Sequence, residues 1–325
     1  MALGITANRI RRKSGSQPTI IDGLPVVIKA GRVRFVDGAR TTNGEGFTFD
    51  TAHNTLQRGV TASARDDSIY VRPLAVGNFY TENVVVPVGT HAGLSIVGTG
   101  NGKGNSVYQA CTIRGVLAVD DPVLELGSSF ASVENLHFWA RAAQTHGFGV
   151  LGNWNTAQGA STTLLNIGSQ VINCSFNTDI LDAPPGAGVV QSAIRLDSTE
   201  GWLIEGCFFQ DCRVGISVGS TVSAAYQIVI KDNLFKGVAS NIAADLMLSD
   251  TNGIEIDGNT FGHTVPSHAA GTMQKYIFCI GGTTVTGGVT RNYFASANAG
   301  YGTDNTNNAE LKRSGNFYSA GIMTS

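Results

Sequence analysis

The chain has 325 residues, a formal net charge of −2 and only 14% charged residues, whereas an average soluble domain has about 25%. It contains 41 glycines but 8 prolines, which suits a β-rich body with many tight turns because glycine reaches positive φ at no steric cost. The near-neutral charge argues against a body that binds nucleic acid. No apolar run is long enough to span a membrane, so we expect no membrane partner.

The N-terminal segment differs in charge from the rest. Its basic residues all precede the first acid, Asp22, and are Arg9, Arg11, Arg12 and Lys13. A basic arm beside a near-neutral body predicts a tail that docks on an acidic partner, although a solvated terminus has the same pattern. The start of the chain shows no secretory signal, which predicts assembly inside a cell.

From residues 48 to 60 the pattern changes to helical spacing. Phe49, Ala52, Leu56 and Val60 would share one face of a helix, with Thr48 or Asp50 as its N-cap. Three apolar segments that read as strands follow, and these are Ser68–Val71, Asn83–Pro87 and Leu94–Val97. A short amphipathic helix before strands is a way for a stacked-coil protein to close its open end.

A six-residue pattern then recurs: an aliphatic residue, two variable residues, a small polar residue, one further residue and an aromatic. The copies are Val171–Phe176, Ile204–Phe209, Ile230–Phe235, Ile256–Phe261 and Val289–Phe294, with degenerate copies at Val133–Phe138 and around Gly315–Tyr318. Successive aromatic positions lie 24 to 38 residues apart. Strands held in register, with insertions in the loops between them, explain this variation better than a fixed helical repeat.

Other short segments with apolar residues two apart lie between these copies. They are Ala193–Leu196, Gly215–Val218, Asp245–Leu248 and Tyr276–Cys279. Two or three such strands with polar turns make one coil of a solenoid. The sequence therefore predicts an all-β fold, a single-stranded right-handed parallel β-helix over residues 46–325 with an N-terminal capping helix. Residues 1–45 are predicted to be a docking arm with a possible strand at Leu24–Lys29.

Stacked coils predict files of equivalent side chains. One interior file would hold Phe176, Phe209, Phe235, Phe261 and Phe294, and a neighbouring turn file would hold Cys174, Cys207, Asn233, Asn259 and Asn292. Asparagine suits such a turn because its amide bonds nearby backbone and it tolerates left-handed geometry. Cysteine can replace it as a small buried apolar residue. The five irregularly spaced cysteines therefore predict core thiols, with no disulfide framework and no zinc site.

The first predicted strands resemble those of a known protein superfamily. The segments Asp67–Pro73, Tyr80–Pro87 and Leu94–Gly100 resemble the opening of pectate-lyase-like β-helix proteins, and the later coils resemble the same superfamily over roughly residues 46 to 320. The resemblance is specific for the fold. It is weak for function, because that fold carries lyases, hydrolases, phage tailspikes and inert virion proteins.

Charge-poor β-helices with a short N-terminal arm further resemble bacteriophage virion proteins. The resemblance implies a homotrimer, partners such as the capsid shell, a location in the virion after assembly in the host cytoplasm, and no cofactor. The favoured hypothesis is a structural virion component of decoration or spike type, which would need an apolar interface between copies. Alternatives are a tailspike that binds or cleaves surface polysaccharide, and a free polysaccharide lyase.

An enzyme of this fold that hydrolyses polysaccharide needs two carboxylates about 5–10 Å apart. The residues that would supply them are Asp197, Glu200, Asp232 and Asp257, chosen from a wider set that includes Asp211 and Glu255. Asp232 and Asp257 occupy nearby positions of successive coils, so their side chains can be neighbours. The pairs Arg195–Asp197 and Asp211–Arg213 are more typical of surface ion pairs. The calcium-binding acid cluster and basic residue of a lyase have no match here.

Two further motifs are assigned to loops. Gly98–Gly104 precedes the strand-like Ser106–Ile113 and lacks the following helix that a phosphate-binding loop requires. His263 and His268 lie near each other without a third ligand, so we expect no metal site.

Overall fold

The computed structural model describes residues 19–21, 24–26, 31–75, 77–100, 111–116, 122–140, 149–152, 166–178, 192–210, 212, 214–220, 224–236, 244–262, 275–280, 284–295, 309–318 and 321–322. Several residues singled out above lie outside these ranges: Arg9, Arg11, Arg12, Lys13, Asp211, Arg213, His263 and His268. The basic run therefore remains a prediction.

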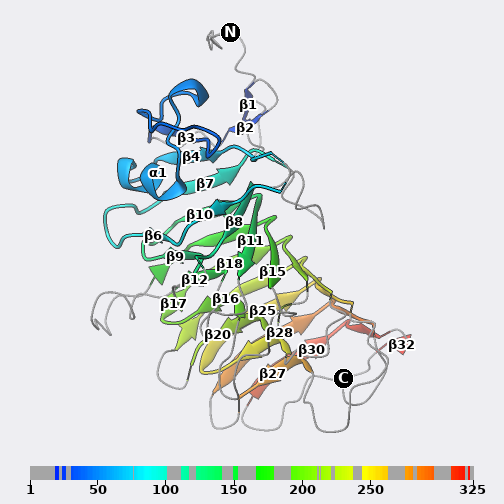
Figure 1. The fold of residues 1–325 in the computed structure, drawn as a ribbon. Coiled ribbons are helices and arrows are strands. Elements are labelled where there is room, and N and C mark those ends of the chain that lie inside the picture. Colours follow the sequence, from blue (N-terminus) through cyan, green and yellow to red (C-terminus); the bar gives the residue numbers. More distant parts are fainter. Residues whose placement is uncertain are drawn as a thin grey trace.

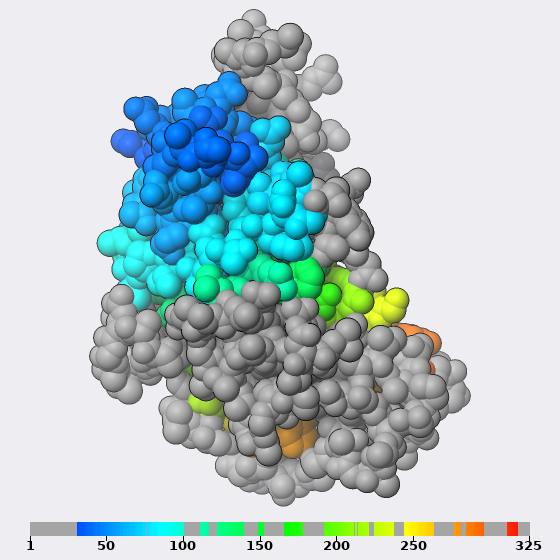
Figure 2. Space-filling view, in the orientation of Figure 1, coloured from blue at the N-terminus to red at the C-terminus, as the bar shows by residue number. Residues whose placement is uncertain are grey.

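The described chain forms a right-handed parallel β-helix whose coils stack along one axis, from β3 at the N-terminal end to β30 at the other (Figure 1). Three sheets run the length of the stack. All pairings between coils are parallel, because each coil places equivalent strands directly above the previous ones. The antiparallel pairs among the described strands are the terminal pair β1–β2 and the terminal pair β31–β32. Figure 2 shows residues 31 to 100, coloured blue to cyan, as one continuous surface at the N-terminal end.

Within the described ranges, the first sheet has 13 strands. Its main strands are β3 (Val33–Val36), β4 (Ser68–Val71), β7 (Ser95–Gly98), β10 (Ser132–Glu134), β14 (Gln170–Ile172), β18 (Leu203–Glu205), β22 (Val229–Lys231), β25 (Thr251–Asp257), β28 (Val285–Thr290) and β30 (Ala309–Ser314). Three short strands join it at the edge: β13 (Asn166–Ile167), β17 (Thr199–Glu200) and β21 (Ala225–Tyr226).

Counting the described strands alone, the second sheet has 10 and the third has 7. The second contains β5 (Tyr80–Thr81), β8 (Cys111–Arg114), β11 (Leu136–Ala140), β15 (Ser175–Thr178), β19 (Phe208–Gln210), β23 (Leu234–Lys236), β26 (Thr260–Phe261), β29 (Tyr293–Phe294), β31 (Phe317–Tyr318) and β32 (Gly321–Ile322). The third contains β6 (Val84–Val86), β9 (Leu124–Leu126), β12 (Val150–Gly152), β16 (Ser192–Leu196), β20 (Val214–Val218), β24 (Ala244–Leu248) and β27 (Lys275–Cys279).

The first sheet begins earlier than the predicted body. Strand β3 pairs in parallel with β4, from Val33 opposite Ser68 to Val36 opposite Val71. The expected boundary at residue 46 is therefore too late for the sheet, because hydrogen bonds to β4 make β3 part of the stack. In the remaining part of the arm, β1 (Thr19–Ile21) and β2 (Leu24–Val26) form a hairpin, so the expected strand at Leu24–Lys29 is described only as far as Val26.

The helical region is split where one helix was expected. Thr48 caps a 3-10 turn at Phe49–Thr51, and the helix α1 spans Leu56–Ala62 with Thr55 as its N-cap. The break occurs because His53 forms a bridge with Val36 of β3, which needs extended backbone. Leu56 and Val60 of α1 are fully buried against the first coil. Across the described ranges, no helix is long and apolar enough to cross a membrane.

The aromatic file fills the interior of the second sheet. Phe138, Phe176, Phe209, Phe235, Phe261 and Phe294 stack with ring centroids 4.6 to 5.2 Å apart and planes within 13° of parallel. All six side chains are at most 2% exposed. The five cysteines are also buried and form no disulfide with one another, and Cys174 and Cys207 occupy the turn file beside the aromatic rings.

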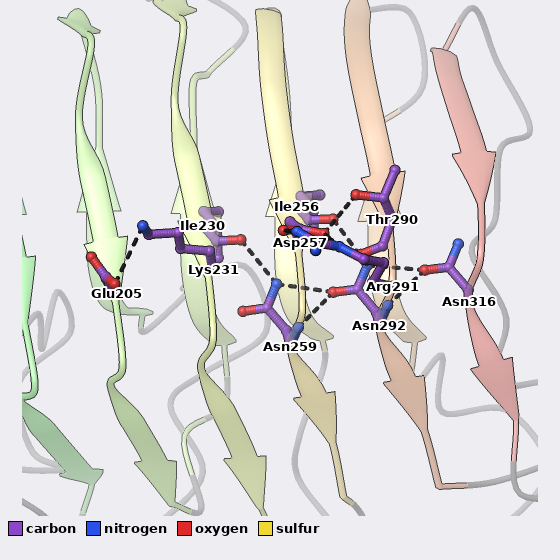
Figure 3. A network of polar contacts seen from close by, with 10 residues as sticks. All are labelled: Glu205, Ile230, Lys231, Ile256, Asp257, Asn259, Thr290, Arg291, Asn292 and Asn316. Atoms are coloured by element: carbon purple, nitrogen blue, oxygen red, sulfur yellow. Dashed lines mark hydrogen bonds and ion pairs between the residues drawn. The ribbon is translucent and has the colours of Figure 1, made fainter.

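The asparagine file closes the turn between the first and second sheets (Figure 3). The amide oxygen of Asn259 accepts hydrogen bonds from the backbone and side-chain nitrogens of Asn233, both at 3.0 Å. Asn292 and Asn316 repeat this arrangement in the next coils. Each amide nitrogen also donates to a backbone carbonyl of the preceding coil, such as that of Ile230. The file thus satisfies buried backbone groups that the turn would otherwise leave without partners.

Candidate functional site

Two of the four acids singled out from the sequence lie on one edge of the β-helix. Asp197 directly follows β16 of the third sheet, and Glu200 lies in β17 at the start of the next pass through the first sheet. Ser198 between them has a left-handed backbone with φ of 49°, which turns the chain sharply. Three residues separate the two positions along the chain, so their Cα atoms lie at most about 10 Å apart.

Asp197 is buried rather than exposed. Its side chain is 4% exposed and one carboxylate oxygen accepts from Arg195 Nε at 2.6 Å. The other oxygen, Oδ1, is buried without a hydrogen-bond partner among the described residues. Burial raises the pKa of Asp197, while the charge and hydrogen bond of Arg195 oppose that rise. The expected ion pair exists, but its carboxyl group is buried and only the arginine is partly exposed.

Glu200 belongs to a file of outward side chains along the same edge, which we call the edge file. Its members are Ile167, Glu200, Tyr226 and Asn252, each paired in register with the next. Ile167 and Tyr226 are each 39% exposed, Asn252 is exposed and Glu200 is half-buried. The file therefore presents an aromatic ring, a carboxylate and an amide to solvent, one per coil.

The sequence analysis did not select Tyr226 or Asn252. A signal was available, because each member of the edge file lies four residues before the first residue of a repeat copy. Thus Glu200 precedes Ile204, Tyr226 precedes Ile230 and Asn252 precedes Ile256. The strands that hold these residues are only two residues long in β13, β17 and β21, which is too short to produce a recognisable alternation.

The other two acids, Asp232 and Asp257, lie on a different edge, and Figure 3 shows Asp257 beside the asparagine file. The backbone nitrogen of Asp232 donates to the carbonyl of Asp257 at 3.1 Å, so the two residues are neighbours in successive coils. The carboxylate of Asp257, however, accepts from Arg291 Nε at 2.8 Å, forms a second contact with Arg291 Nη2, and accepts from the Thr290 hydroxyl at 2.7 Å. Asp232 is exposed at a left-handed turn.

The hydrogen bond from Arg291 is the main reason that the pKa of Asp257 is lowered. A carboxylate held ionised by a guanidinium does not donate a proton near neutral pH. Lys231 and Glu205 form another ion pair, between the two preceding coils, with Nζ and Oε1 3.3 Å apart. Arg291 therefore neutralises the charge of Asp257, which suits a structural ion pair better than the acid of a catalytic pair, and the pairing of Asp232 with Asp257 as acid and base stays a prediction.

Metal ligation has no support in the part of the chain that the structure describes, where no group of three or more histidines, cysteines, aspartates or glutamates is placed to hold an ion. The candidate site is thus the edge that carries Asp197 and the edge file, and its chemistry is that of a protonatable carboxyl beside polar and aromatic side chains.

Comparison with known proteins supports the fold. No protein-family model and no curated protein matches the sequence. Among solved structures, the chain is similar to an alginate lyase from Paenibacillus sp. str. FPU-7, with a TM-score of 0.52 at 11% identity, over 88% of this chain and 97% of that one. A pectin methylesterase from Aspergillus niger gives a TM-score of 0.45 at 12% identity, over 89% and 87% of the chains.

A tailspike protein from Acinetobacter baumannii bacteriophage Fri1, described as a capsular polysaccharide depolymerase, gives a TM-score of 0.39 at 11% identity, over 88% of this chain and 57% of that one. At such identities the likeness shows that the chain shares the parallel β-helix architecture. It does not indicate which residues act, and that assignment rests on the geometry above.

Proposed function

We propose that the chain is a bacteriophage virion component of spike type that binds polysaccharide along the edge file. The observation that carries the proposal is Asp197, a buried carboxyl with a raised pKa and an unpartnered oxygen, three residues from the half-buried Glu200. Perturbed carboxyl groups of this kind concentrate at functional sites. The virion location follows from the sequence resemblance alone.

The edge file suits an extended glycan. Its side chains repeat once per coil, about 4.8 Å apart, and they run parallel to the solenoid axis. Tyr226 offers an apolar ring surface with a polar end, while Glu200 and Asn252 offer hydrogen-bonding groups to sugar hydroxyls. The alginate lyase with the same fold acts, by its description, on a polysaccharide, which agrees with this choice of ligand class.

Binding of polysaccharide and its cleavage would be measured in separate experiments. Affinity of the purified chain for alginate, pectin and neutral dextran would be measured by calorimetry, for wild type, Tyr226→Ala and Glu200→Gln. We expect both variants to bind at least tenfold more weakly than wild type to the polysaccharide that wild type prefers. Glu205→Gln, a half-buried acid on the other edge, is the matched control and should bind normally.

Cleavage would be followed in parallel by the release of new reducing ends. If the chain cleaves its ligand, Asp197→Asn should abolish product formation without weakening binding, since the raised pKa of Asp197 favours the protonated form that a general acid needs. Equal affinity of wild type, Tyr226→Ala and Glu200→Gln would refute the edge file as the binding surface.

A purely structural role in the virion is the second candidate. It is favoured by an outward strip of apolar side chains on the second sheet, at Leu234, Tyr293 and Phe317, of the kind that a protein packed against its own copies needs. This role predicts no affinity for any of the polysaccharides and a homotrimer in solution, with the basic arm docking on a particle surface such as the capsid shell.

A further inference from the structure

Asparagine followed by glycine is a dipeptide prone to deamidation, because glycine has no side chain to hinder attack of its backbone nitrogen on the preceding amide. The chain contains three such dipeptides, Asn43–Gly44, Asn101–Gly102 and Asn252–Gly253, and the second lies outside the described residues. Asn43 and Asn252 are both exposed, and each follows a threonine. A difference in reactivity between these two sites would therefore come from the groups that the fold places around them.

At Asn43–Gly44 two separate groups hold the reacting atoms. The nitrogen of Gly44 donates to the backbone carbonyl of Ala52 at 3.2 Å. A carbonyl oxygen carries no proton, so it accepts from Gly44 but has no proton to pass on. The side-chain oxygen of Asn43 lies 3.2 Å from Nδ1 of His53. No single group among these contacts links the nitrogen to the amide oxygen.

At Asn252–Gly253 one hydroxyl contacts both reacting groups. The nitrogen of Gly253 donates to Oγ1 of the half-buried Thr286 at 3.0 Å, and the same hydroxyl donates to Oδ1 of Asn252 at 2.6 Å. A hydroxyl can accept and donate at the same time. The oxygen of Thr286 therefore joins the nitrogen that would attack to the oxygen on which negative charge would develop.

An irregularity in the strand pairing produces this arrangement. The pairing of β25 with β28 shifts register between Thr251 and Ile254, which interrupts the regular ladder of backbone hydrogen bonds. Gly253 has a φ of 76°, a left-handed conformation that glycine adopts without strain. The carbonyl of Asn252 accepts from the nitrogen of Gln227 at 2.8 Å, which fixes its backbone from the other side. The irregular pairing explains why a threonine hydroxyl takes the hydrogen bond from Gly253.

We propose that Asn252 is a self-modifying site at which Thr286 relays a proton during deamidation. The nitrogen of Gly253 forms a bond to Cγ of Asn252 and gives its proton to Oγ1 of Thr286, which passes its own proton to Oδ1. The tetrahedral carbon then returns that proton to the side-chain nitrogen, the bond between them breaks, and ammonia leaves a five-membered succinimide. Water adds to either carbonyl of the succinimide and gives aspartate or isoaspartate.

The reaction changes the charge of the edge file. It replaces the amide of Asn252 by a carboxylate, directly beside Tyr226 of the preceding coil. The isoaspartate product also lengthens the backbone by a methylene group at the irregular pairing. The proposal does not depend on polysaccharide binding, because the reacting groups belong to the chain and the co-reactant is water.

Peptide mass mapping after incubation at neutral pH would measure the reaction at each site, and enzymatic methylation would identify isoaspartate. In the folded wild type, Asn252 should react at least about tenfold faster than Asn43, because a positioned proton-transfer group contributes a factor of this size or more. In urea the two rates should become equal, since the relay requires the fold. A folded-state rate at Asn252 no higher than at Asn43, or an excess at Asn252 that persists in urea, would overturn the proposal.

Two variants separate the hydroxyl of Thr286 from its place in the strand. Thr286→Val keeps the branched shape that suits a strand but has no hydroxyl, so the rate at Asn252 should fall to about that of Asn43. Thr286→Ser keeps the hydroxyl and should react close to the wild-type rate. Circular dichroism would show that both are folded, and the rate at Asn43 should be unchanged in both. A wild-type rate in Thr286→Val, or equal losses in the two variants, would exclude the relay.

Discussion

Phe209 and Phe235 lie on neighbouring coils with their ring centroids 4.6 Å apart and their planes 7° from parallel. Both belong to repeat copies in which the aromatic is the last residue, and the strands that hold them, β19 and β23, pair in register. The spacing of the rings is close to the spacing of the strands, so each coil contributes its ring to the file without any change in backbone. The file is therefore a direct product of the repeat.

Phe235→Ala should destabilise the fold by about 3–5 kcal/mol, because it removes a fully buried ring and leaves a cavity between Phe209 and Phe261. Urea unfolding followed by circular dichroism would measure the loss. Leu234→Ala, on the same strand but facing outward, is the control and should cost much less. A loss below about 1 kcal/mol for Phe235→Ala would contradict an interior position for the ring.

Asn259→Ala should also destabilise the protein, although it removes little apolar surface. The change would leave the backbone nitrogen of Asn233 and the carbonyl of Ile230 without the partners they now have, and each unsatisfied buried group costs about 1–3 kcal/mol. Chemical unfolding would measure this, with the exposed Asn78→Ala as control. If the Asn259→Ala and Asn78→Ala variants are equally stable, water must replace the hydrogen bonds that the amide of Asn259 makes.

Glu82→Ala should loosen helix α1. The carboxylate of Glu82 accepts hydrogen bonds from the first amides of the helix, those of Leu56 at 2.8 Å and Gln57 at 2.9 Å, and loss of such a cap typically costs about 0.5–2 kcal/mol. Hydrogen exchange should become faster across Leu56–Ala62 and remain unchanged in β20. Unchanged exchange in the helix would show that burial of Leu56 and Val60 alone holds it in place.

Asp197→Asn should stabilise the protein at neutral pH. Because burial raises the folded-state pKa of Asp197, its contribution to stability is present below the unfolded pKa of about 3.9 and is lost as the pH rises through the folded value. The urea midpoint of the variant should thus exceed that of wild type at pH 7, with the difference shrinking towards pH 3. A lower midpoint at pH 7 would show that the ion pair with Arg195 outweighs the cost of burial.

Local periodicity in the sequence is enough to predict the coil and its two files. Residues such as Phe235 and Asn259 recur at equivalent positions of successive copies, and parallel strands in register turn that recurrence into stacking whatever the length of the loops. The alternation within a strand likewise separates Phe235, which faces the core, from Leu234, which faces outward. Local periodicity is sufficient for these conclusions because they depend on one coil and its neighbour.

The candidate site, in contrast, depends on contacts between residues that are distant in the chain. Asp257 and Arg291 are 34 residues apart, and their pairing depends on a left-handed turn in the coil that follows. Asp197 differs from Asp232 in burial, not in residue type, and burial depends on what the rest of the fold packs around each turn. The electrostatic state of a carboxylate is set by the charges and dielectric around it in three dimensions, and a one-dimensional pattern contains neither.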